Sequence, residues 1–131
     1  MLRFDYMPSD FHPLFLFIGE SSDLAALAKL LRRFADDPQP IAVVERIPGA
    51  VSRTDLVLAP AVAEFGMREL GGKFIWKLNG WQATRIAERI ELLIPVDNKS
   101  GSEMLEVGSE GEIPVKVSRG EFTDNFLIDR R

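Results

Sequence analysis

The chain has 131 residues, of which 16 are basic and 20 acidic, and its formal net charge is −4. This length fits one domain, residues 1–131, with a core of its own. Hydrophobic residues make up 46% and charged residues 27%, which excludes a disordered chain. The absence of cysteine excludes a disulfide scaffold, a thiolate metal site and a cysteine nucleophile. The acidic balance argues against nucleic-acid binding.

The N-terminal segment lacks the features of a signal peptide, which requires a continuous apolar run. Asp5, Pro8 and Asp10 interrupt any such run. The longest apolar stretch, Leu14 to Ile18, has five residues, whereas a membrane-spanning helix needs about 20. We therefore expect a cytoplasmic protein with no membrane partner.

The first regular elements are a strand and a helix. Leu14 to Ile18 is wholly apolar, which is typical of a strand buried on both faces. A helix is predicted from about Asp23 to Ala35, with Ser21 or Ser22 as its N-cap. Its apolar stripe, at spacings of three and four, consists of Leu24, Leu27, Ala28, Leu31 and Phe34.

Residues 41–59 read as a hairpin with a long loop, built from strands at 41–46 and 55–59. The pattern at 60–72 fits a short helix or a strand, and Gly71-Gly72 ends it in either case.

The second half begins with an alternating strand at 73–78. Asn79 then caps a helix, with Gln82 in the register of a capping box. The apolar stripe of that helix consists of Ala83, Ile86, Ala87, Ile90 and either Leu93 or Ile94. Strands are expected at 104–107 and 113–118, and the second should be an edge strand because Pro114 has no N–H to donate. No internal repeat is visible.

These elements predict an α+β fold: a mostly antiparallel sheet of about five to seven strands with two helices packed on one face. A parallel, right-handed crossover between the strands at 14–18 and 41–46 is an alternative for the first unit.

No catalytic frame or metal-binding pattern is present. The one histidine, His12, lies outside any Gly-x-Ser-x-Gly elbow. The loop at 97–101 has Lys99 where an EF-hand would need an oxygen ligand, and Gly66 to Lys73 lacks the Walker spacing. We therefore predict no catalytic residue, no metal ligand and no cofactor.

Several basic residues fall near the two tryptophans in the sequence. They could form a small nucleic-acid patch, although the neighbouring Glu88 and Glu91 favour an ordinary solvated helix flank. The set is Lys73, Lys77, Arg85 and Arg89, beside Trp76 and Trp81.

The C-terminal part is more acidic than the rest. Residues 97–131 hold five basic and eight acidic side chains, a net charge of −3. Such a cluster could attract a basic protein and speed encounter, or it could serve solubility alone. The predicted partner-binding carboxylates are Glu103, Glu106, Glu110, Glu112, Glu121 and Asp124.

Aromatic residues are concentrated near the N-terminus. Phe4, Tyr6 and Phe11 precede the first apolar strand. Aromatic side chains are enriched at interface centres, so these three residues predict a self-association surface and a homodimer. The alternative is that they fill the protein's own core.

Residues 73–122 carry a resemblance. An aromatic strand, Phe74-Ile75-Trp76, leads into a helix, and a strand at 104–107 precedes the segment 115–122. This layout is similar to the C-terminal part of several small bacterial αβ families of unknown function, including immunity proteins of contact-dependent and polymorphic toxin systems. The chain departs from them in having no histidine before residue 104. The resemblance implies a non-catalytic protein that masks the active site of a toxin.

Two functional hypotheses from different classes follow. The first is a non-catalytic protein-binding module that masks a basic partner through its acidic face. The alternative is a small-molecule-binding domain or enzyme that uses carboxylates, arginines and Trp76 or Trp81 in a cleft. A homo-oligomeric structural role is compatible with either.

Overall fold

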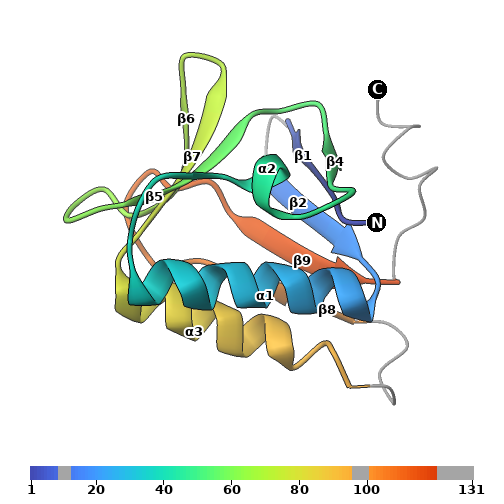
Figure 1. The fold of residues 1–131 in the computed structure, drawn as a ribbon. Helices are drawn as coiled ribbons and strands as arrows, with labels where there is room; N and C mark the ends of the chain where they lie inside the picture. The colour runs from blue at the N-terminus through green and yellow to red at the C-terminus, as the bar shows by residue number, and fades with distance from the viewer. Residues whose placement is uncertain (9–12, 96–100, 121–131) are drawn as a thin grey trace.

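The computed structural model describes residues 1–8, 13–95 and 101–120. Within them it is an α+β fold with two mixed sheets and three helices, which confirms the predicted class (Figure 1). The two long helices lie side by side beneath the strands, so both cover the same side of the molecule.

The first sheet has five strands in the order β4-β1-β2-β9-β8. Its two central strands, β2 and β9, are parallel, and each pairs antiparallel with the neighbour on its other side. The bounds are β1 Arg3–Met7, β2 Leu14–Gly19, β4 Val51–Ser52, β8 Gly101–Met104 and β9 Val115–Arg119.

The second sheet has four strands in the order β3-β5-β7-β6. Its central pair, β5 and β7, is again parallel and flanked by antiparallel neighbours. The bounds are β3 Ile41–Ala42, β5 Leu56–Pro60, β6 Gly66–Leu70 and β7 Lys73–Leu78.

Both long helices begin with a capping box. In α3 (Gly80–Glu91) the Asn79 side chain accepts the Gln82 N–H, as predicted. In α1 (Ser21–Asp36) the N-cap is Glu20, paired with Asp23, rather than Ser21 or Ser22. The sequence prediction missed this cap because glutamate is a less common N-cap than serine. A single helical turn, α2, spans Val43–Arg46.

The sheet arrangement corrects several expectations. The strands form two mixed sheets instead of one mostly antiparallel sheet. The N-terminal segment forms a strand, β1, that was not expected. Of the two alternatives for 60–72, the strand is confirmed as β6. The strand expected at 41–46 stops after two residues, where α2 begins. The strand expected at 104–107 instead ends at Met104.

The strand near Pro114 is central instead of lying at an edge, because β9 lies between β2 and β8. Pro114 comes just before β9 and needs no N–H there. Its carbonyl accepts the Phe15 N–H at 2.9 Å. The parallel partner of β2 is therefore β9, and the crossover considered between 14–18 and 41–46 is not formed.

The two halves of the chain repeat one topology that the sequence does not reveal. Each half has a hairpin (β1-β2 or β6-β7), a long helix and then an antiparallel strand pair (β3-β5 or β8-β9). The last pair of each half joins the hairpin of the other half. Each sheet therefore contains strands from both halves.

Equivalent residues are 59 positions apart at the centre of this arrangement. In the first sheet, Phe17 of β2 lies opposite Phe4 of β1 and Val117 of β9. In the second sheet, Trp76 of β7 lies opposite Met67 of β6 and Leu58 of β5 in the same way. The Phe17 and Trp76 rings stack with centroids 5.5 Å apart, and both residues are buried.

Helix contacts also occur twice, with the helices exchanged. The Ser21 hydroxyl of α1 donates to the carbonyl of Ile94, just after α3, at 2.9 Å. At the opposite ends Gly80 of α3 faces Ala35 of α1, where an added Cβ would lie 3.1 Å from the carbonyl oxygen. Such an exchange of partners is what an internal two-fold relation between the halves requires. The core unites both helices with the inner faces of both sheets.

Candidate functional site

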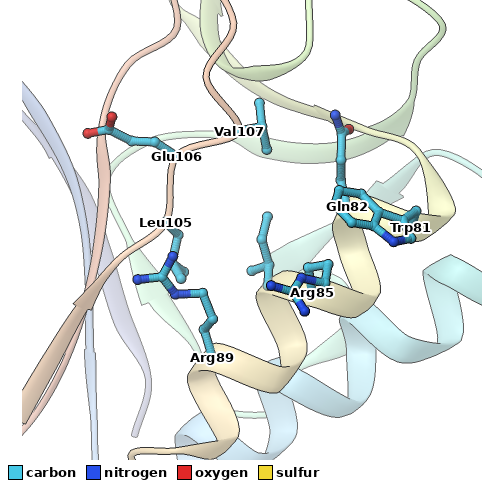
Figure 2. Close-up of a pocket in the computed structure, with 8 residues that line it drawn as sticks. Trp81, Gln82, Arg85, Arg89, Leu105, Glu106 and Val107 are labelled. Atoms are coloured by element: carbon cyan, nitrogen blue, oxygen red, sulfur yellow. The ribbon is translucent and has the colours of Figure 1, made fainter.

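The candidate site is a pocket of about 230 Å³ between α3 and the segment that follows β8. Figure 2 shows Trp81, Gln82, Arg85 and Arg89 on α3 opposite the segment 105–107, with the Glu106 carboxylate turned away from α3. Its lining consists of Trp81, Gln82, Arg85, Ile86, Arg89, Leu105, Glu106 and Val107.

Trp81 lies at the rim of this pocket on the first turn of α3. Its side chain is 72% exposed, the most exposed large aromatic residue in the described part of the chain. The Arg85 guanidinium carbon lies 5.7 Å from the centre of the indole ring, within the range of a cation–π contact. Burial of α3 against the core through Ala83, Ile86, Ala87 and Ile90 leaves this position outside the apolar stripe.

Both arginines of the pocket have carboxylate partners. Arg85 Nη1 lies 3.7 Å from Glu88 Oε1. Arg89 contacts Glu103 Oε1 through Nε and Nη2, each at 3.0 Å. Their positive charges are thus largely balanced before any ligand arrives.

The four predicted acidic residues that the structure describes fall into two groups. Glu103 and Glu112 are engaged within the fold. Glu103 pairs with Arg89, and the Glu112 carboxylate accepts three backbone N–H groups at 2.6–3.1 Å, those of Val107, Gly108 and Ser109. Glu112 therefore organises its own loop.

Glu106 and Glu110 are exposed and form no ion pair with any residue within the described ranges. Glu106 lines the pocket, and Glu110 lies four residues further along the same loop. Its backbone carbonyl accepts a hydrogen bond from Arg68 Nη2 at 2.7 Å, which holds the loop against β6. The other two predicted carboxylates, Glu121 and Asp124, lie outside the described residues.

Phe4 and Tyr6, two of the aromatic residues expected to form a self-association surface, do not form an exposed cluster. Phe4 is 1% exposed and packs on Phe15 and Phe17 in the core. Tyr6 is half-buried, with its ring 4.9 Å from that of Phe74. Phe11 and His12 lie outside the described residues. Phe4 is thus a core residue.

The basic patch considered near the tryptophans is divided by the fold. Trp76 is 1% exposed in the core, so only Trp81 reaches a cleft. Lys77 lies on β7 and pairs with Glu64 at 3.6 Å, away from the pocket of Arg85. The alternative hypothesis named arginines and Trp81 in a cleft, but the sequence did not indicate that residues 105–107 form its other wall. The position of Trp81 off the apolar stripe of α3 is the signal that marks this cleft.

The chain follows different courses after the equivalent strands β3 and β8 of the two halves. Ile41 of β3 pairs with Leu58, and Glu103 of β8 pairs with the equivalent residue Val117. Two residues further on, Val43 and Leu105 are therefore equivalent, and each is 1% exposed. After Val43 the chain makes the helical turn α2 and buries Ile47. After Leu105 the chain stays irregular through 112, apart from a turn, and leaves the hollow open.

None of the helices in the described part of the chain is long and apolar enough to cross a membrane. Across residues 1–8, 13–95 and 101–120, no three His, Asp or Glu side chains are grouped to hold a metal ion. The chain matches no protein-family model, no curated protein and no solved structure.

Proposed function

We propose that the protein is a non-catalytic protein-binding module that masks a basic partner. The binding surface is the α3 face, which we define as Trp81, Arg85, the pocket beside them and the adjoining loop that carries Glu106. The observation that carries the proposal is Trp81, which is 72% exposed at the rim of the pocket, beside a loop whose exposed carboxylate Glu106 has no ion-pair partner among the described residues.

The charge around the pocket supports a basic partner. Arg85 and Arg89 are matched by Glu88 and Glu103, which leaves the negative charge of Glu106 in excess. Glu110, on the same loop, adds to that excess. Complementary charge speeds encounter with a positively charged surface and selects against acidic partners.

The residue types on the α3 face support protein recognition. Tryptophan and arginine are the residues most enriched among interface positions that dominate affinity. Trp81 offers a large, rigid apolar surface that is already exposed in the isolated chain. Its burial by a partner would remove apolar area from water without unfolding any part of this chain.

The proposal includes the wider expectations from the sequence. The resemblance to bacterial immunity proteins favours a toxin as the basic partner, met in the cytoplasm, with no nucleic acid involved. Glu121 and Asp124 extend the acidic surface in this proposal. A homodimer remains a separate proposal, for which Tyr6 and Phe11 are the remaining aromatic candidates.

The test is retention of proteins from a lysate of the source cell, washed at low and then high salt and identified by mass spectrometry. We expect one basic protein that is lost at high salt. The charge reversal Glu106→Lys should abolish its retention. The matched control Glu45→Lys changes an exposed glutamate of α2, outside the α3 face, and should retain it. Equal retention by both variants would contradict the proposal.

A small-molecule site is a second candidate function, because the indole of Trp81 and the side chains of Arg85 and Arg89 line the pocket. Its volume of about 230 Å³ is below the range of about 300–1,000 Å³ that is usual for ligand pockets. A thermal-shift screen of common metabolites tests this candidate, since a ligand of the folded state raises the melting temperature. No rise with any compound would contradict it.

A further inference from the structure

We infer that the pocket beside α3 binds a small aromatic carboxylate, with the carboxylate on Arg85 and Arg89 and the ring beside Trp81. This inference rests on the second candidate function, the small-molecule site, and names its ligand class. It follows from the hydrogen-bond donors of the lining, their limited engagement within the fold, and the apolar surface next to them.

The charged groups that line the pocket are donors. Arg85 and Arg89 lie one helical turn apart on α3, and both line the hollow. The carboxylate of Glu106, the one acidic residue of the lining, is turned away from α3 (Figure 2). A guanidinium donates hydrogen bonds and accepts none. The pocket therefore suits a ligand with acceptor oxygens, and a carboxylate matches a guanidinium through two parallel hydrogen bonds.

Both arginines retain donors for such a ligand. Arg85 Nη1 lies 3.7 Å from Glu88 Oε1, which is too long for a hydrogen bond, and both side chains are exposed. Because exposed ion pairs contribute little, a ligand can replace this contact at small cost. Glu103 binds Nε and Nη2 of Arg89 and so orients its guanidinium. The third nitrogen, Nη1, has no partner among the residues that the structure describes.

The rest of the lining suits an apolar ring. Ile86 and Leu105 line the pocket as core residues, at 4% and 1% exposed. Trp81 lies at the rim with 72% of its side chain exposed, so its indole is accessible to a second ring. Aromatic rings pack against one another in offset or edge-to-face arrangements, which add to the gain from removing apolar area from water.

The size of the pocket limits the ligand. Its volume of about 230 Å³ is below the range of about 300–1,000 Å³ that is usual for ligand pockets. A hollow of this size favours one ring with a short acidic chain over a nucleotide or a larger cofactor.

The test uses the full chain labelled with ¹⁵N and titrated with sodium phenylacetate, with sodium chloride at equal concentration as the ionic-strength control. The two indole N–H signals are separate reporters, because Trp81 is exposed at the pocket and Trp76 is buried in the core. We expect a saturable shift of the Trp81 signal at millimolar concentration or below and none of the Trp76 signal. Phenylacetamide, which has the shape without the charge, and acetate, which has the charge without the ring, should each bind at least about tenfold more weakly.

Variants connect the Trp81 signal to Arg85. Arg85→Gln should weaken the apparent affinity for phenylacetate by about fivefold, the effect of losing one exposed charged contact. Arg53→Gln, the matched change at an exposed arginine outside the pocket, should leave the affinity unchanged. The inference is overturned by no saturable Trp81 shift with phenylacetate, by equal affinity for phenylacetamide or acetate, or by equal affinity of the Arg85 variant.

Failure of this inference can be separated from failure of the functions proposed above. If phenylacetate leaves Trp81 unmoved but another metabolite raises the melting temperature, the small-molecule function stands and the ligand class is wrong. If phenylacetate binds through Arg85 and no basic protein is retained from the lysate, the ligand class stands and the masking function fails.

Discussion

Arg32 of α1 and Glu91 of α3 form a two-point ion pair across the helix layer. Arg32 Nε donates to Glu91 Oε2 and Nη2 donates to Oε1, each at 2.7 Å. The residues are 59 positions apart, and each is the twelfth residue after its N-cap, Glu20 or Asn79. One polar contact therefore joins equivalent positions of the two halves, as the Phe17–Trp76 stack does in the core.

The first prediction concerns the pH dependence of this pair. Hydrogen bonding and the charge of Arg32 lower the pKa of Glu91 below its ordinary value. A carboxylate with a lowered pKa in the folded state stabilises the fold above its ordinary pKa, and this contribution disappears as the pH falls through the folded pKa. Glu91→Gln should therefore lower the urea midpoint by more at about pH 7 than at about pH 3.

Urea unfolding of the wild type and the variant at both pH values measures this effect. The exchange variant Arg32→Glu with Glu91→Arg should recover part of the stability that either single reversal loses. An undiminished difference at low pH would show that Glu91 acts through packing instead of charge.

The second prediction concerns Arg119, whose Nη1 donates to the carbonyls after α3. The acceptors are Leu93 at 2.8 Å, Ile94 at 3.2 Å and Pro95 at 2.7 Å, and the residue is 8% exposed. Arg119→Met should cost about 2–3 kcal/mol of unfolding free energy, because buried carbonyls lose a charged donor. Denaturant unfolding measures the loss.

The control for Arg119 is Arg53→Met, which removes an exposed arginine. It should change the unfolding free energy by less than about 0.5 kcal/mol. Equal effects of the two changes would mean that the carbonyl contacts of Arg119 contribute nothing beyond its net charge.

The third prediction compares two glycines with positive φ. Gly66 has φ of +99°, and a Cβ there would lie 2.7 Å from the Cβ of Glu112. Gly72 has φ of +83° with nothing within 4 Å of an added Cβ. Gly72→Ala should cost about 1 kcal/mol from backbone strain alone. Gly66→Ala should cost at least about 1 kcal/mol more, because it also displaces Glu112 from its three N–H donors.

Thermal unfolding of both glycine variants tests this difference. Equal melting temperatures would show that the loop around Glu112 yields without cost. The comparison sets a glycine with a close neighbour against one with open space, and both have positive φ.

The fourth prediction separates the two tryptophans. Trp81→Phe should change the unfolding free energy by less than about 0.5 kcal/mol, because the side chain is mostly exposed. Trp76→Phe should cost about 1–3 kcal/mol through imperfect packing against Phe17. In the Trp81→Phe variant, the fluorescence comes from Trp76 and should be protected from acrylamide quenching. In the Trp76→Phe variant, the fluorescence comes from Trp81 and should be quenched. Equal quenching would contradict the assigned burial.

Local signals in the sequence predicted the elements with strong periodicity. Residues close together in the sequence were enough to predict the Asn79 capping box, the apolar stripes of both helices and the alternating strand β7. Such short-range patterns reflect the geometry of one element and its buried face. The turn at Gly71 and Gly72 was also predicted, and both residues adopt positive φ.

The pairing of strands was not predictable from those signals. β9 is central because it lies beside β2, about 100 residues earlier in the chain, and Pro114 gave the opposite indication. The repeat was invisible because only the burial pattern is shared: Leu24, Leu27 and Ala28 correspond to Ala83, Ile86 and Ala87. Similarly, the pocket joins α3 to a segment without regular structure, so only the position of Trp81 could have indicated it.

The exchange of strand pairs between the halves determines how the chain must assemble. The first sheet needs β8 and β9 from the C-terminal half, and the second needs β3 and β5 from the N-terminal half. A cut between β5 and β6 would leave two fragments, each with one hairpin lacking its parallel neighbour. Neither fragment could complete a sheet by itself, whereas the pair, once mixed, could form every strand pairing of the intact protein. The connection between Pro60 and Gly66 acts as a tether that keeps two interdependent pieces at high local concentration.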